Sequence, residues 1–161
     1  MEKVEQKYTN RSVTHPVTQD PGITDQHGRS FNYLRIAVNE KCNLRCIYCM
    51  PEKGISFEPQ DKLLTRKEVI RVIQVVAKLG VNKIRFTGGE PLLRKDLVEL
   101  VSGAAETPGI DSLNLTTNGV LLANAVESLK DAGLTGVNVS IDTLVKEKYT
   151  EITRRDYIDQ A

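Results

Sequence analysis

Apolar and polar positions follow two different periods along this chain. Short segments in which apolar and polar residues alternate predict strands over 33–38, 83–87, 112–116 and 137–141. Longer segments with an apolar residue every three or four positions predict helices over 65–79, 96–106 and 121–132, and a last helix that begins near Leu144. This regular alternation of strand and helix indicates parallel strands with right-handed crossovers, either in an open doubly wound sheet or in a barrel.

The segment 65–79 has the clearest helical pattern. Thr65 and Glu68 have the spacing of a capping box, and Gly80 directly follows the last apolar position. The apolar positions of this segment share one helix face: Val69, Ile70, Ile73, Val76 and Leu79. The pattern therefore predicts an amphipathic helix that begins at Thr65.

The predicted strands are apolar on one face only, although strands of parallel sheets are usually apolar on both. The apolar parity is expected to face the helices and consists of Ile36, Val38, Ile84, Phe86, Leu113, Leu115, Val137, Val139 and Ile141. The other parity is polar and partly basic, with Arg35, Lys83, Arg85, Asn114, Thr116, Asn138 and Ser140. Two explanations remain open: a sheet with one solvated face, or a barrel whose interior binds an anionic ligand.

Composition and charge narrow the class of protein. The 161 residues suffice for one ordinary domain, and a hydrophobic fraction of 40% is typical of a globular chain. A formal net charge of +1 argues against general binding of nucleic acid or membranes, so any anion must be held by a local group of bases. Residues 1–30 are polar, rich in proline and glycine and without periodicity, which predicts a flexible arm before a single domain over 31–161.

Three cysteines occur in one short segment, and the chain contains no others. Cys42, Cys46 and Cys49 have a spacing that suits a cubane iron–sulfur cluster with one iron left free of protein ligands. The alternative is a structural metal site with a fourth ligand elsewhere, for which the chain offers only His15 and His27. Clustered thiols without disulfide partners indicate a reducing compartment, the cytoplasm or, in a eukaryote, the mitochondrial matrix.

Unusual loops follow all four predicted strands and should therefore meet at the carboxyl edge, where α/β barrels build their sites. Gly88 and Gly89 suit close approach of the main chain to a ligand, although glycine pairs are also common in tight turns. Glu90 is available to accept a hydrogen bond from an ammonium group. Tyr48 lies between two cysteines and is predicted to touch a cofactor rather than to serve packing alone. The predicted fold is an α/β, partial TIM-like (βα) barrel of about four units.

Basic residues fall into two groups. Arg35 and Arg85 either pair with buried carboxylates or bind phosphate, and phosphate is favoured because no acidic residue shares their strand parity nearby. The other group is predicted to form a solvated helix face: Lys62, Arg66, Lys67 and Arg71.

Cys42-x-x-x-Cys46-x-x-Cys49 followed by Gly88-Gly-Glu-Pro91 resembles the radical S-adenosylmethionine superfamily. Further segments resemble its GTP 3′,8-cyclase family of molybdenum-cofactor biosynthesis: Tyr33-Leu-Arg-Ile, Lys83-Ile-Arg-Phe-Thr, Leu115-Thr-Thr-Asn-Gly and Asn138-Val-Ser-Ile-Asp. The resemblance implies a [4Fe–4S] cluster on Cys42, Cys46 and Cys49, with S-adenosylmethionine on the fourth iron. It also implies GTP as substrate and an external electron donor, and it allows a homodimer of the full-length protein.

The same resemblance implies roles for individual side chains. Contacts with S-adenosylmethionine are expected from Tyr48, Gly88, Gly89, Glu90 and Ser140, and contacts with GTP from Arg35, Arg85 and Thr116. The family's second cysteine triplet, which binds another cluster, has no counterpart after Cys49, so the resemblance implies an incomplete barrel and a fragment of a longer enzyme. A peptide-modifying member of the superfamily and a non-enzymatic, cluster-binding fragment are the alternative hypotheses.

Overall fold

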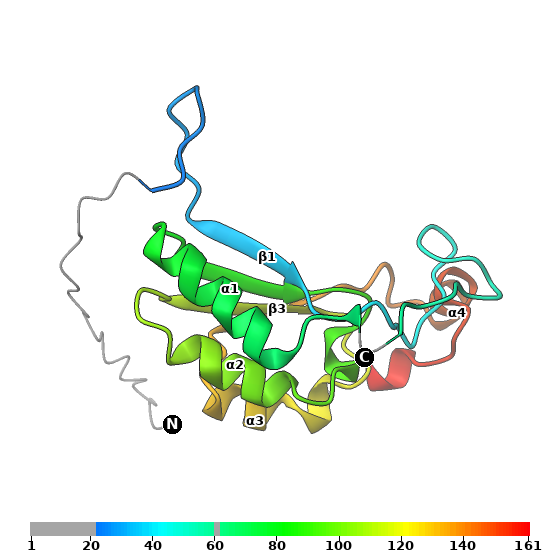
Figure 1. The fold of residues 1–161 in the computed structure, drawn as a ribbon. Coiled ribbons are helices and arrows are strands. Elements are labelled where there is room, and N and C mark those ends of the chain that lie inside the picture. The colour runs from blue at the N-terminus through cyan, green and yellow to red at the C-terminus, as the bar shows by residue number, and fades with distance from the viewer. Residues whose placement is uncertain (1–21, 60–61) are drawn as a thin grey trace, which may run out of the picture.

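The computed structural model describes residues 22–59 and 62–161, and its sheet is entirely parallel (Figure 1). The strands are β1 (Tyr33–Ala37), β2 (Lys83–Thr87), β3 (Ser112–Thr117) and β4 (Gly136–Val139), in the order β1-β2-β3-β4. Each strand pairs with the next one along the chain, whereas a doubly wound sheet reverses its order at a switch point. The described residues therefore form an open part of a (βα) barrel with four units, which confirms the predicted fold class.

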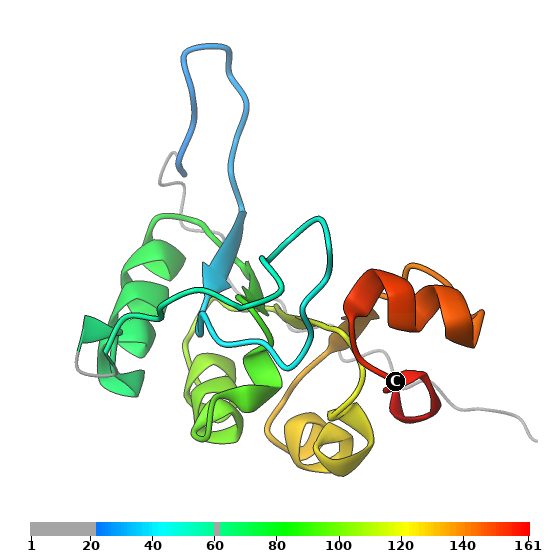
Figure 2. The same cartoon turned by 90° about the vertical axis from the view of Figure 1, so that its right-hand side faces the viewer.

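The helices of the first three units cover one face of the sheet. α1 (Arg66–Lys78), α2 (Leu97–Ala105) and α3 (Val126–Asp131) lie side by side beneath it, while α4 (Lys146–Thr153) lies beyond the carboxyl ends of the strands (Figures 1 and 2). Short 3-10 turns occupy Pro91–Leu93, Leu122–Asn124 and Ile158–Gln160. The opposite face of the sheet has no helix among the described residues.

The hydrophobic core lies between the sheet and these three helices. Side chains of the predicted apolar parity are fully or almost fully buried in β2 and β3: Ile84, Phe86, Leu113 and Leu115. They pack in one cluster with helix residues that include Ile73, Leu100, Val101 and Leu129. Burial of these large apolar side chains is the main stabilising term for the fold.

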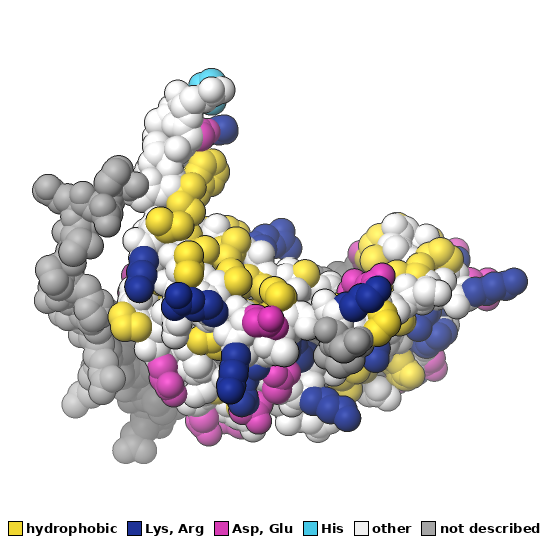
Figure 3. Space-filling model, in the orientation of Figure 1, with side chains coloured by type: hydrophobic (Ala, Val, Ile, Leu, Met, Phe, Trp, Pro, Cys, Tyr) yellow, Lys and Arg dark blue, Asp and Glu magenta, His cyan; other side chains and the backbone are white. Residues whose placement is uncertain are grey.

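The predicted capping box of α1 is present. The Thr65 hydroxyl accepts the Glu68 N–H at 3.3 Å, and the Glu68 carboxylate accepts the Thr65 N–H at 2.8 Å. The Thr65 hydroxyl also donates to the Glu68 carboxylate at 2.7 Å, and this bond together with that from the Thr65 N–H lowers the pKa of Glu68. The capping box fixes the start of the helix. The solvated basic helix face is confirmed for Arg66, Lys67 and Arg71, which are all exposed on α1, whereas Lys62 is exposed but precedes the helix and pairs with Glu58. Basic and acidic side chains are mixed over the surface seen in Figure 3.

Two elements differ from the sequence prediction, the helix expected over 121–132 and the strand β4. The helix expected over 121–132 is a 3-10 turn, Leu122–Asn124, followed by α3, because the Gly119 carbonyl accepts the Leu122 N–H and closes a tighter turn. β4 ends at Val139 rather than Ile141, since its partner strand β3 ends at Thr117. The expectation that β4 buries its apolar parity is wrong for Val139, which is 45% exposed.

Residues 22–31 form a closed loop next to the amino edge of the sheet. Thr24 and Ser30 form an antiparallel bridge, and the Ile23 N–H donates to the Leu79 carbonyl at the end of α1. The rest of the predicted flexible arm, residues 1–21, lies outside the described residues. In the part of the chain that the structure covers, no helix is long and apolar enough to cross a membrane.

Candidate active site at the carboxyl edge of the sheet

The unusual loops meet at one edge of the sheet, as the parallel topology requires. The segment 39–51, here called the cysteine loop, follows β1 and lies beside the other strand-end loops and α4 (Figure 2). Asn39 fixes its first turn: the amide oxygen accepts the Lys41 N–H at 2.8 Å, and the amide nitrogen donates to the Glu90 carbonyl at 2.8 Å. The Cys46 carbonyl then accepts the N–H groups of both Cys49 and Met50. Hydrogen bonds within the loop and to the Glu90 carbonyl thus fix part of its main chain.

The three thiols differ in exposure. Cys49 is exposed, whereas Cys42 and Cys46 are partly buried, and burial raises the pKa of both. The Leu44 N–H donates to the Cys42 sulfur at 3.4 Å, which orients this side chain. Among residues 22–59 and 62–161, no three Cys, His, Asp or Glu side chains converge closely enough to hold a metal ion as they stand. Binding at the predicted ligands therefore requires their side chains to turn toward one another.

Among the described residues, no histidine lies near the cysteine loop as a fourth ligand for a structural metal. His27 lies in the loop 22–31, which precedes β1, while the cysteine loop follows β1. The two loops are therefore at opposite ends of the same strand. His15 lies outside the described residues.

The Gly88-Gly89 turn packs directly on the cysteine loop. The Gly89 N–H donates to the Asn39 carbonyl at 2.8 Å, and the Glu90 N–H donates to the Lys41 carbonyl at 2.7 Å. A methyl group on Gly88 would lie 2.2 Å from the Asn39 carbonyl oxygen, and one on Gly89 would lie 2.4 Å from that of Lys41. Both glycines are therefore required by loop-to-loop packing, and their contact with S-adenosylmethionine stays a prediction.

Glu90 is fully buried, and its carboxylate is already occupied. It accepts the Leu92 N–H at 3.0 Å, the Thr117 hydroxyl at 2.8 Å and the Asn118 N–H at 2.8 Å. The carboxylate thus joins the loops after β2 and β3. Two of the three bonds fall on Oε1 and one on Oε2, and the contact of this carboxylate with an ammonium group stays a prediction.

Replacing Glu90 with glutamine tests this structural role. We expect Glu90→Gln to lower the free energy of unfolding by about 1.5–3 kcal/mol, because the amide group must face an N–H donor that loses its acceptor. Urea denaturation of the metal-free chain measures the change. Glu99→Gln, at an exposed position of α2, is the matched control and should change stability by less than about 0.5 kcal/mol. Equal stability of the two variants would contradict the role given to Glu90.

Asn118 connects this network to the cysteine loop. Its side-chain amide donates to the Asn43 side-chain oxygen at 2.8 Å and lies 3.9 Å from the Cys42 sulfur. No pattern in the sequence assigned Asn118 a role, although the Thr-Asn-Gly segment after a strand was a usable signal. A side chain that orients a metal ligand has a large influence on the metal site.

The helix-free face of the sheet contains the two predicted phosphate-binding arginines. Arg35 and Arg85 are direct neighbours in the β1–β2 register. Arg85 Nη1 donates to the Thr116 hydroxyl at 3.3 Å and to the Asn138 amide oxygen at 2.6 Å, and its guanidinium lies 5.9 Å from the centre of the Tyr33 ring. The described ion pairs include neither arginine, and the buried Nε of Arg85 has no partner in the described structure.

Ser140 and Tyr48 lie at the exposed rim of the same edge. The Ser140 N–H donates to the Thr117 carbonyl, which places its side chain just beyond the end of β4. Tyr48 is 70% exposed, and its hydroxyl donates to the Asp142 carboxylate at 2.8 Å. This bond raises the pKa of Tyr48, because ionisation would put two negative charges side by side. Tyr48 therefore joins the cysteine loop to the loop after β4, and its contact with a cofactor stays a prediction.

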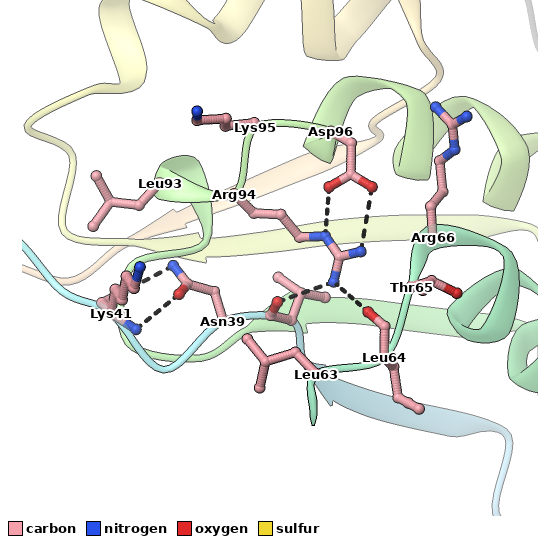
Figure 4. Close-up of a pocket in the computed structure, with 11 residues that line it drawn as sticks. Asn39, Lys41, Leu63, Leu64, Thr65, Arg66, Leu93, Arg94, Lys95 and Asp96 are labelled. Atoms are coloured by element: carbon pink, nitrogen blue, oxygen red, sulfur yellow. Dashed lines mark hydrogen bonds and ion pairs between the residues drawn. The ribbon is translucent and has the colours of Figure 1, made fainter. Parts of the chain in front are cut away.

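Arg94 is a further residue that the sequence did not single out. Its side chain is 9% exposed, pairs with both oxygens of Asp96 and donates to the carbonyls of Val38 and Leu64 (Figure 4). The hydrogen bonds from Arg94 lower the pKa of Asp96. One guanidinium group thus joins the end of β1, the residue before the cap of α1, and the start of α2.

The cysteine loop, the glycine turn and the open parallel sheet together define the class of protein. Residues 36–161 match the family described as the Radical SAM superfamily. The chain belongs to the radical S-adenosylmethionine superfamily. The cofactors of this domain are accordingly a [4Fe–4S] cluster and S-adenosylmethionine.

Within this superfamily, the chain is similar to curated proteins of molybdenum-cofactor biosynthesis. The chain is 47% identical over 151 residues to the molybdenum cofactor biosynthesis protein moc-5 of Caenorhabditis elegans, covering 94% of this chain and 25% of that protein. It is 48% identical over 132 residues to a GTP 3′,8-cyclase of Listeria monocytogenes, covering 82% of this chain and 40% of the enzyme. The chain therefore spans a quarter to two fifths of the length of these relatives.

Among solved structures, Streptococcus suis SuiB bound to S-adenosylmethionine has a similar fold. The TM-score is 0.62 at 23% identity, and the match covers 80% of this chain and 27% of SuiB. At this level of identity the likeness concerns the fold alone. It supports the barrel architecture and gives no preference between nucleotide and peptide substrates.

The donor set of the cysteine loop fits the superfamily's cluster. Three thiols lie in one loop, two of them partly buried, and the Leu44 N–H and the Asn118 amide lie close to the Cys42 sulfur. Three thiolates satisfy three irons of a cubane and leave the fourth for the cofactor. The exposed main chain of Gly88 and Gly89 borders the loop and offers polar groups on that side.

Proposed function

We propose that this chain forms the cofactor-cleaving part of a GTP 3′,8-cyclase, which converts GTP to (8S)-3′,8-cyclo-7,8-dihydroguanosine 5′-triphosphate at the start of molybdenum-cofactor biosynthesis. Similarity to two curated proteins of that function supports the proposal. The observation that carries it is the pair Arg35 and Arg85 on the helix-free face, neither of which takes part in a described ion pair. Guanidinium groups at such a site suit a triphosphate.

Two sets of residues have separate roles in this proposal, one in binding the cofactors and the other in binding the substrate. When bound and reduced by an external electron donor, the cluster supplies the one-electron cleavage of S-adenosylmethionine to a 5′-deoxyadenosyl radical. Cys42, Cys46 and Cys49 hold the irons, while the Gly88-Gly89 main chain, Tyr48 and Ser140 orient the cofactor. Arg35, Arg85 and Thr116 hold the substrate on the helix-free face, so that its ribose stays close to the radical and away from water.

A binding experiment on the arginine pair tests the substrate assignment. We expect Arg85→Ala to weaken GTP binding to the reconstituted chain by about 1.5–3 kcal/mol, because a charge-assisted hydrogen bond to phosphate is lost. Isothermal titration measures the dissociation constants of GTP and guanosine for both forms. The variant should lose affinity for GTP and keep its affinity for guanosine.

Arg71→Ala is the matched control, because Arg71 is an exposed arginine of α1 on the helix side of the sheet. It should bind GTP as the unchanged chain does. Unaltered GTP affinity in Arg85→Ala would remove the phosphate role of this face. Equal dissociation constants of guanosine and GTP for the unchanged chain would likewise contradict the phosphate role, because the phosphates would then add nothing to binding.

A further inference from the structure

The end of α4 holds the cysteine loop in place. The Arg45 N–H donates to the Thr153 carbonyl at 3.0 Å, and the Ile47 N–H donates to the Ile152 carbonyl at 2.9 Å. These carbonyls belong to the last turn of α4, where the helix itself offers no N–H partner. The hydrogen bonds flank Cys46 on both sides. The last turn of the helix is thereby satisfied by a loop that lies more than a hundred residues earlier in the sequence.

Arg154 adds two bonds from its side chain. Its Nη1 donates to the Arg45 carbonyl and to the Met50 carbonyl, each at 3.1 Å. One nitrogen therefore joins the residue before Cys46 to the residue after Cys49. These two carbonyls bracket the turn that contains both Cys46 and Cys49.

The main chain at Arg154 is held in an unusual conformation. Arg154 has φ 55° and ψ 28° and is the one non-glycine residue with positive φ in the described ranges. Left-handed backbone is disfavoured for residues with a Cβ, and glycine is the usual residue at this position after a helix. Thr153, 2% exposed, supports the junction, since its hydroxyl donates to the Tyr149 carbonyl at 2.8 Å. Backbone strain of this kind persists where the surrounding contacts determine it.

We propose that Arg154 is a positioning residue for the cluster, and that it sets the spacing of Cys46 and Cys49 through the Arg45 and Met50 carbonyls. Glycine would satisfy the backbone at this position better than arginine does. Any basic side chain would complement the dipole at the helix end, so that effect does not account for a guanidinium group aimed at two loop carbonyls. The double contact with the cysteine loop does account for it. The inference rests on the cluster of the superfamily and is independent of the GTP assignment.

Three variants separate the positioning role from a role in folding. Arg154→Gly removes the guanidinium and relieves the backbone, Arg154→Lys keeps the charge with a single donor nitrogen, and Lys148→Ala is the control at an exposed position of α4. Each chain is reconstituted anaerobically with iron and sulfide. Iron content, the rate of iron loss to a chelator and the electron paramagnetic resonance spectrum of the reduced cluster are then measured, together with the melting temperature of the metal-free chain.

We expect Arg154→Gly to melt at or above the temperature of the unchanged chain and yet to lose iron about 10-fold faster, the usual scale for residues that orient metal ligands. Its spectrum should be broadened, because the thiol spacing is no longer fixed. Arg154→Lys should fall between the two, and Lys148→Ala should match the unchanged chain. Unchanged iron loss and spectrum in Arg154→Gly would overturn the proposal. A fall in melting temperature with an unchanged spectrum would also overturn it, because Arg154 would then serve the fold alone.

Discussion

Serine in place of Cys42, Cys46 or Cys49 is expected to abolish the iron–sulfur cluster almost completely. The unchanged chain should take up about four irons after anaerobic reconstitution, as a cubane held by three thiolates requires. A serine hydroxyl is a poor iron ligand beside thiolates, so each variant should retain less than about one tenth of the iron and of the visible absorbance. Iron analysis with absorption spectroscopy measures both quantities.

Lys53→Ser is the control for these three variants, because Lys53 is an exposed residue shortly after the last cysteine. It should reconstitute as fully as the unchanged chain. A colourless protein that retains one zinc ion and no iron would contradict the cluster assignment. Full iron content in any one of the cysteine variants would contradict its assignment as a ligand.

Alanine at Gly88 is expected to cause the largest loss of stability in the chain, with a fall of more than about 4 kcal/mol in the free energy of unfolding. The new methyl group would lie 2.2 Å from the Asn39 carbonyl oxygen, and φ at this residue is 141°. The loop around Asn39 must therefore move, and the backbone at residue 88 must change its conformation. We expect the glycine turn to separate from the cysteine loop. Urea denaturation of the metal-free chain measures the resulting loss in the free energy of unfolding.

Two further glycines divide this cost into its parts. Gly28 has φ 78° and nothing within 4 Å of the position a Cβ would take, so Gly28→Ala should cost only about 1–2 kcal/mol for the backbone. Gly89 has no positive φ but has the Lys41 carbonyl oxygen 2.4 Å away, so Gly89→Ala isolates the steric contact. An equal loss of stability in Gly88→Ala and Gly28→Ala would show that the packing of the two loops does not require glycine at position 88.

Local patterns of the sequence were sufficient for much of the fold. The capping box at Thr65 and Glu68 involves residues three positions apart, and the period of two in β2 and β3 is set by each strand alone. The order of strands also followed, because four consecutive βα units have few right-handed arrangements. The carboxyl-edge position of the cysteine loop came from this topology and required no resemblance.

The contacts that shape the candidate site were beyond these patterns. Arg94, Asn118 and Arg154 act on residues 30 to 109 positions away, so no local pattern identifies their partners. Glu90 shows the converse problem. The sequence indicated a carboxylate that could meet an ammonium group, and it gave no sign that the same carboxylate accepts three main-chain and hydroxyl donors and joins two loops.

The dependence of the cysteine loop on the end of α4 has a consequence for synthesis of the protein. Arg154 is 109 residues beyond Arg45, and ribosomes add about 5–20 residues per second. All three cysteines therefore emerge roughly 5–20 s before the segment that shapes their loop is made. During that interval the thiols belong to an unfolded nascent chain, open to stray metals and oxidants. We therefore expect iron and sulfide to be loaded after translation has passed this helix and α4 has formed.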